Sequence, residues 1–192
     1  MSYDSAAGIV YALGSNGKYR TTHFNSEEIG LYLSRTGGYR WERVLDGRHF
    51  FSFSKYAALV VAVDATENVN TVKFSWDQGA SWSSCAWDQI SSFAVTQVSF
   101  VSNSDTHFLI VGEYTNGQGT ILSLDFADAV PRWCEETDLE VFEPAVGGAC
   151  LLGQSHSYTR RQRSAQCAMH AYQASTSLDT HSCGCTRMDY QW

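Results

Sequence analysis

The chain has 192 residues, of which 17% are charged and 14% are aromatic, and its formal net charge is −7. This composition excludes intrinsic disorder, which requires low hydrophobicity and high charge. The acidic balance also disfavours a nucleic-acid partner, because phosphate binding needs a clustered basic surface and the one basic cluster is Arg160, Arg161 and Arg163.

The first 130 residues read as short strands joined by tight turns, without helical periodicity. The candidate strands are rich in Val, Ile, Phe and Tyr and span residues 8–13, 31–34, 41–45, 57–64, 71–75, 93–101, 108–112 and 121–126. Turn dipeptides that tolerate positive φ lie at Asn16-Gly17, Asp46-Gly47 and Asn116-Gly117. Because residues 57–63 are apolar without alternation, we expect both faces of that strand to be covered by other sheets.

Two segments, residues 34–41 and 75–82, resemble each other, and their first serines lie 41 positions apart (75 − 34). This period is typical of a four-stranded blade of a β-propeller, and a blade cannot bury its faces alone. The strand pattern ends near Pro131. The sequence therefore predicts an all-β fold, with blades of a partial propeller over residues 1–143 and a small disulfide-rich module over residues 144–192.

The second of these segments fits the Asp-box pattern Ser-x-Asp-x-Gly-x-x-Trp through Ser75, Asp77, Gly79 and Trp82. Asp77 can accept backbone N–H bonds within the turn, Gly79 can adopt positive φ, and Trp82 can pack under the strands. The motif is therefore expected to staple a hairpin, and the turn occupies the carboxylate that a catalytic role would need.

The first copy keeps Ser34, Gly38 and Trp41 of the Asp-box pattern, but Thr36 stands where the aspartate is expected. We expect that turn to retain a hydroxyl acceptor and to lose the charge.

A glycosidase is the alternative function, since Asp-box propellers include sialidases. Hydrolysis requires paired carboxylates or a tyrosine and glutamate nucleophile system, with arginines to hold an acidic sugar. Glu113 and Tyr114 are candidates, yet no arginine follows Arg48 in the strand-rich part. We assign no catalytic residue. A propeller that binds carbohydrate without hydrolysing it stays a second alternative.

The C-terminal quarter carries four of the six cysteines, and its apolar runs are scarce. Cys183 and Cys185, beside His181, suggest half a metal site that Cys150, Cys167 or His156 would complete. The spacing lacks the two-residue gap of a zinc knuckle, so disulfides are favoured among Cys150, Cys167, Cys183 and Cys185, in an oxidising compartment. We predict no metal and no cofactor.

The remaining basic and histidine residues have plainer interpretations. The run of residues 160–163 is a protease-processing site, a contact for an acidic ligand or, most commonly for such a run, a solvated strand edge. No ligand-like cluster forms among the other histidines, so surface or turn positions are expected for His23, His49, His107 and His170.

Together these residues resemble the luminal domain of sortilin and its relatives, the vacuolar protein sorting receptor ten family. The segments that carry the resemblance, in chain order, are residues 8–15, 32–41, 45–50, 59–64, 71–75, 124–126, 134–138 and 148–153, then Tyr158, Arg160, Arg161, Cys167, residues 183–185, and Asp189-Tyr190. The likeness covers nearly the whole chain. It departs from the family at Thr36 and at Trp192, where the family has its next cysteine.

The resemblance implies a type I membrane receptor, not an enzyme, that binds protein or peptide cargo and traffics it between Golgi, endosomes and lysosome or vacuole. This chain would be the last two to three blades of a ten-bladed propeller and the start of a ten-cysteine module, on the luminal or extracellular side. The membrane helix and the cytosolic signals for trafficking adaptors would lie beyond residue 192. The ligand-binding residues are unknown, because the family's peptide contacts lie in middle blades.

The resemblance also bears on the cysteines. The family counterpart of Cys134 bonds to an early propeller cysteine, so Cys134 is expected to be unpaired in this chain. The pairing of the other cysteines stays open, and Cys85 has no family counterpart.

Overall fold

The structure is a computed structural model, and it describes residues 6–15, 28–66, 68–88, 90–102, 105–144, 150, 153–169, 179–185 and 187. The features predicted at Asn16-Gly17, His23, His170, Asp189-Tyr190 and Trp192 lie outside the described residues.

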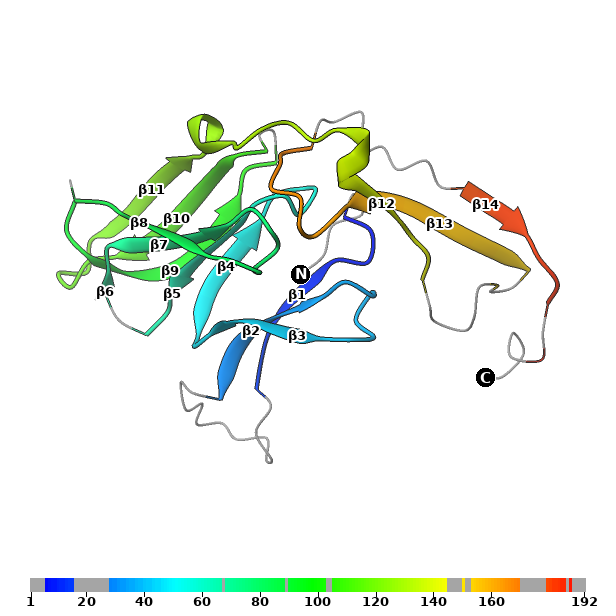
Figure 1. The fold of residues 1–192 in the computed structure, drawn as a ribbon. Helices are drawn as coiled ribbons and strands as arrows, with labels where there is room; N and C mark the ends of the chain where they lie inside the picture. Colours follow the sequence, from blue (N-terminus) through cyan, green and yellow to red (C-terminus); the bar gives the residue numbers. More distant parts are fainter. Residues whose placement is uncertain are drawn as a thin grey trace.

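The described residues form four antiparallel sheets with two short 3-10 turns between the third and the fourth (Figure 1). The first sheet, in the order β1-β2-β3, contains Val10–Ser15, Ile29–Ser34 and Glu42–Asp46. The second, in the order β4-β5-β7-β8, contains His49–Phe53, Val60–Asp64, Thr71–Ser75 and Ser83–Ala86. The third, in the order β11-β10-β9-β6, contains Gly119–Asp125, His107–Glu113, Phe93–Phe100 and Asn68–Val69. The last, in the order β12-β13-β14, contains Leu139–Phe142, Gln154–Arg161 and Asp179–Ser182, and the 3-10 turns are η1 (Ala127–Ala129) and η2 (Glu136–Asp138).

This architecture confirms the predicted fold class, an all-β partial propeller followed by a small disulfide-rich module. The two Asp-box segments connect β2 to β3 and β7 to β8, so each occupies the same place in its sheet. The predicted domain boundary after residue 143 stays a prediction. Strand β12 precedes that boundary and pairs with β13, which follows it.

The second sheet lies between the first and the third, and β5 shows why (Figure 1). Val61 and Val63 point into a core shared with the third sheet, whereas Val60 points into a core shared with the first sheet. All three side chains have no exposed surface. The prediction that the apolar run would be covered on both faces is therefore confirmed, because successive side chains of a strand point to opposite faces.

A third core belongs to the last part of the chain. It gathers Tyr56, Cys134, Ala165, Cys167 and Met169, all of them buried. Tyr56 comes from the turn between β4 and β5, so this core seats the module on the second sheet. Arg161 also connects the module to the second sheet. It is 1% exposed, and its Nη2 donates to the carbonyl oxygen of Ala57 at 3.2 Å.

Sequence reasoning missed several strands. Three phenylalanines in β4 are the available signal for it, but the strand begins at His49, directly after the turn signal of Asp46-Gly47. Strands β8, β13 and β14 are polar, as the sequences of residues 83–86, 154–161 and 179–182 show, so propensity gave no signal and strand pairing holds them in place.

His49 was expected at a surface or turn position, and that expectation is wrong, since the side chain is 1% exposed at the start of β4. Its Nδ1 lies 3.2 Å from the carbonyl oxygen of Gly47, and its Nε2 lies 3.2 Å from Nζ of Lys73. The carbonyl needs a donor, so Nε2 is left to accept from the ammonium. Burial lowers the pKa of His49 from its ordinary value of 6.5, and Lys73 lowers it further, against the opposing effects of the Gly47 bond and of Asp64.

We predict that His49 makes the fold sensitive to acid. Because the pKa of His49 is 6.5 when unfolded and lower when folded, the unfolded state binds more protons between these values. The free energy of unfolding should therefore decrease as the pH falls through 6.5 toward the folded pKa. His49→Gln keeps an acceptor for Lys73 and should flatten this dependence in urea titrations at a series of pH values.

The matched control is His107→Gln, which leaves His49 in place and should keep the wild-type slope. An unchanged slope in His49→Gln would show that another group causes the acid sensitivity.

Candidate functional site

The turn of residues 75–82 is closed by two side chains. The Ser75 hydroxyl donates to Oδ1 of Asp77 at 2.8 Å and accepts the backbone N–H of Gly79 at 2.7 Å. Asp77 accepts the backbone N–H of Ser81 at Oδ1 and the Ser81 hydroxyl at Oδ2, at 2.8 and 2.5 Å. Gln78 and Gly79 both have positive φ, at 57° and 85°. Ser75, Asp77 and Gly79 thus make the bonds and the turn expected of an Asp box.

The turn of residues 34–41 repeats this arrangement without the carboxylate. The Ser34 hydroxyl accepts the backbone N–H of Gly38 at 2.8 Å, as Ser75 does for Gly79. The Thr36 hydroxyl accepts the backbone N–H of Arg40 at 2.8 Å, which is the bond that Asp77 makes to Ser81 in the other copy. The indole N–H of Trp41 donates to the carbonyl of Gly38 in its own turn.

Trp82 joins its sheet to the preceding one. Its indole N–H donates to the carbonyl oxygen of Val44 in β3 at 2.8 Å, and its ring packs against the core between the first two sheets. Gly79 lies against the same residue, since a Cβ at this position would lie 2.8 Å from Cβ of Val44. The Asp box therefore holds two blades together as well as closing its own hairpin.

The electrostatics of Asp77 fit a structural role. Burial alone would raise the pKa of Asp77, but hydrogen bonds from Ser81, Ser75 and Gln166 outweigh burial and lower this pKa. Gln166, from the segment after β13, donates to Oδ2 at 3.3 Å. A carboxylate that is stabilised in its charged form and occupied by donors is poorly suited to act as a general acid.

The residues proposed for glycoside hydrolysis are not brought together. Glu113 is exposed at the end of β10, and the Tyr114 ring packs edge-on against Phe93 with ring centroids 5.8 Å apart. Among the described residues, no hydrogen bond or ion pair joins the side chains of Glu113, Tyr114 and Arg48.

The basic run of β13 is turned inward, so the expectation of a solvated strand edge is wrong. The strand lies between β12 and β14, and Arg160 pairs with Glu140 at 2.7 Å between Nε and Oε1. Arg160 also donates to the carbonyl of Arg35 at 2.6 Å and lies over the Phe142 ring, 4.0 Å from its centroid. With Arg161 buried as well, the folded chain does not offer this pair to a processing protease.

Glu140 links this run to both Asp-box turns. Its carboxylate also pairs with Arg35, which follows Ser34 in the first box. Arg35 in turn donates to the side chain of Gln78 in the second box. One chain of polar contacts thus connects the last sheet with the turns of the first two sheets.

The cysteines form two disulfides, Cys134–Cys167 and Cys150–Cys183, and the partners of each lie 33 positions apart in the sequence. The expectation that Cys134 would be unpaired is therefore wrong. The counterpart inferred from the resemblance was an upstream cysteine, but the contact between Trp133 and Ala168 places Cys134 beside Cys167. The expectation that Cys185 would form a disulfide is also wrong, because Cys183 is bonded to Cys150 and the thiol of Cys185 is free and exposed. Cys85 is free and exposed as well.

The disulfide pairing determines which cysteines of this region could bind a metal ion. Cys150 and Cys183, both considered as zinc ligands, have no thiolate to offer while bonded to each other. The same holds for the cluster of Cys134, Asp138 and Cys167, whose two sulfurs are joined.

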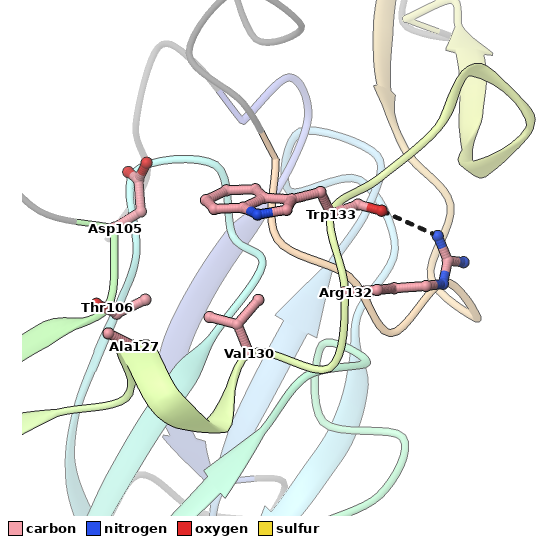
Figure 2. A pocket seen from close by; sticks show the side chains of 6 residues that line it. All are labelled: Asp105, Thr106, Ala127, Val130, Arg132 and Trp133. Atoms are coloured by element: carbon pink, nitrogen blue, oxygen red, sulfur yellow. Dashed lines mark hydrogen bonds between the residues drawn. The ribbon is translucent and has the colours of Figure 1, made fainter.

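A hollow of about 400 Å³ lies beside Trp133, where the chain passes from the third sheet to the module (Figure 2). Its walls are Asp105, Thr106, Ala127, Val130, Arg132 and Trp133. The Trp133 side chain is 51% exposed. The sequence shows that the strand pattern ends near Pro131, but it gives no sign that Asp105 lies near Trp133, because the two residues are 28 positions apart.

The stacked sheets and the tryptophan-ended turns define an Asp-box β-propeller protein, here joined to a disulfide-stapled module. Comparison with known proteins agrees with this class. The family model described as sortilin, neurotensin receptor 3, matches residues 1–97, and the model for its C-terminal part matches residues 100–191. The chain belongs to the sortilin and Vps10 family.

Individual relatives are similar over the whole chain. The sortilin-related receptor of Oryctolagus cuniculus is 27% identical over 195 aligned positions, covering 100% of this chain and 8% of the relative. Vacuolar protein sorting/targeting protein 10 of Chaetomium globosum is 27% identical, and that of Colletotrichum graminicola is 28% identical, each covering 97% of this chain and 13% of the relative. The chain thus spans about a tenth of the length of these relatives.

Family membership points to a receptor rather than an enzyme. The junction between the two matches falls at residues 97–100, inside β9, so it does not coincide with the end of a sheet. In the part of the chain that the structure describes, no helix is long and apolar enough to span a membrane.

We predict that the Thr36 hydroxyl and the Asp77 carboxylate both stabilise their turns by accepting hydrogen bonds, and that the carboxylate contributes more to the free energy of unfolding. Asp77→Val removes every acceptor and should lower the free energy of unfolding by about 1.5–3 kcal/mol. Asp77→Thr recreates the Thr36 arrangement and should lose about 1 kcal/mol less. Denaturant titration measures both, and equal losses would contradict the assigned role of the acceptor.

The disulfide pattern gives a second prediction. Non-reducing peptide mapping should find Cys134 linked to Cys167 and Cys150 linked to Cys183, with Cys85 and Cys185 open to alkylation. Replacing Cys134 and Cys167 by alanine should lower the free energy of unfolding by about 2–5 kcal/mol. Replacing Cys85 by alanine is the control and should leave stability within about 0.5 kcal/mol of wild type.

A different linkage of Cys134 in the peptide map would contradict this pairing directly.

Proposed function

We propose that this chain is a luminal part of a type I transmembrane sorting receptor, which binds protein or peptide cargo and carries it between Golgi, endosomes and the lysosome or vacuole. The observation that carries the proposal is that both halves of the chain match models of one receptor family, end to end. The relatives are named as a sortilin-related receptor and a vacuolar protein sorting/targeting protein.

The structure supports a scaffolding role for this part of the receptor. Its second Asp box joins two blades, and Arg35 of the first Asp-box turn and Arg160 of β13 share the carboxylate of Glu140 in β12. Within the described residues, Glu113 forms no ion pair with an arginine, so the alternative of a glycosidase gains no support from this part of the structure. We further propose that the rest of the receptor contains a membrane helix and cytosolic signals for trafficking adaptors.

The proposal is tested with the full gene product in the cell that makes it. Deleting the gene should cause soluble precursors of lysosomal or vacuolar hydrolases to appear in the medium, because a sorting receptor normally retains them. Reintroducing the gene should restore their retention, and the tagged receptor should co-fractionate with Golgi and endosomal membranes.

Unchanged hydrolase sorting, together with a receptor absent from those membranes, would contradict the proposal.

A further inference from the structure

The hollow beside Trp133 contains the carboxylate of Asp105, which has no direct partner among the residues that the structure describes. Asp105 makes no hydrogen bond and no ion pair with any described residue. The charge of Lys55 attracts the carboxylate from a distance, without a direct contact. Burial raises the pKa of Asp105, and the opposing effect of Lys55 is smaller. The carboxylate has therefore lost part of its hydration without gaining a bond in return, which is unfavourable.

The other polar groups of the hollow are already engaged. The Thr106 hydroxyl donates to Oδ1 of Asp125 at 2.8 Å. Arg132 grips Asp138 with both terminal nitrogens at 2.6 Å, and its guanidinium is directed away from Asp105 (Figure 2). This pairing holds the pKa of Asp138 at about 2, so the two charges stay matched. Arg132 is thus unavailable to Asp105.

The remaining walls are apolar. Val130 packs on the core of the third sheet, Ala127 opens the short turn η1, and Trp133 presents its half-exposed indole. A volume of about 400 Å³ lies within the range of small ligand sites. The combination suits a group with a long apolar stem and a charged end, because the stem covers the walls and the charge reaches the carboxylate.

We propose that this hollow receives a lysine or arginine side chain of a protein partner, with the cationic group facing Asp105 and the aliphatic stem along Trp133 and Val130. An anionic group would meet Asp105 with like charge. An uncharged apolar side chain would bury the carboxylate further without pairing it. The formal net charge of −7 favours the approach of a basic partner over longer distances.

This inference goes beyond the proposed sorting role, because it needs neither a membrane nor a trafficking route. The partner is defined by its chemistry: a protein that presents a lysine or arginine side chain at its surface.

The test uses the 192-residue chain and a capped pentapeptide, Gly-Gly-Arg-Gly-Gly. The indole N–H resonance of Trp133, assigned by its loss in Trp133→Phe, should shift in a saturable way as the peptide is added. The same peptide with citrulline in place of arginine keeps the shape without the charge and should bind about tenfold more weakly. Rising salt concentration should weaken the binding of the arginine peptide.

Two matched variants locate the charge. Asp105→Asn should reduce affinity for the arginine peptide about tenfold, while Asp128→Asn, which removes the same charge from the exposed neighbouring turn, should leave affinity unchanged. Amide spectra that match wild type away from the hollow confirm that each variant is folded.

Equal binding of the citrulline peptide, full affinity in Asp105→Asn, preferential binding of a glutamate peptide, or no saturable shift would each overturn the inference. None of these outcomes bears on hydrolase sorting, so failure here is distinguishable from failure of the proposed function.

Discussion

The arrangement of this chain depends on the ion pairs that the carboxylate of Glu140 forms with two arginines. The carboxylate lies between Arg35 of the first Asp-box turn and Arg160 of β13, and all three side chains are at least two-thirds buried. If one member of such a cluster is removed, the opposite charge stays unpaired where little water can reach it, which is unfavourable. Moving one sheet away from the others would separate the same charges at a similar cost. The module is thus fixed against the blades by charge as well as by its apolar core.

The need to bury apolar faces explains how the blades stack. A sheet with two apolar faces is unstable without a neighbour on each side, and β5 meets this requirement by sending Val60 to one core and Val61 to another. Trp82 then adds a directional bond between neighbours, since its N–H reaches the backbone of β3. Non-directional burial and a few placed hydrogen bonds together determine how adjacent sheets pack.

Local features of this fold were predictable from the sequence, and features that depend on distant contacts were not. The bonds of Ser75 and Asp77 lie within eight residues, so the motif alone implied them. The polar strand β13 and the inward course of Arg161 depend on neighbours far along the chain, and neither leaves a periodic pattern. The pairing of Cys134 with Cys167 and the meeting of Asp105 with Trp133 are likewise products of the tertiary fold.

Hydrogen exchange in a Glu140→Gln variant tests most directly whether the module and the blades are held as one unit. We expect faster exchange both in β13 and at the amides of Gly38 and Arg40 in the first Asp-box turn, because both sides lose the same counter-charge. Glu143→Gln, at an exposed position just after β12, is the control and should exchange as wild type does. Faster exchange confined to β12 and β13 would contradict the account.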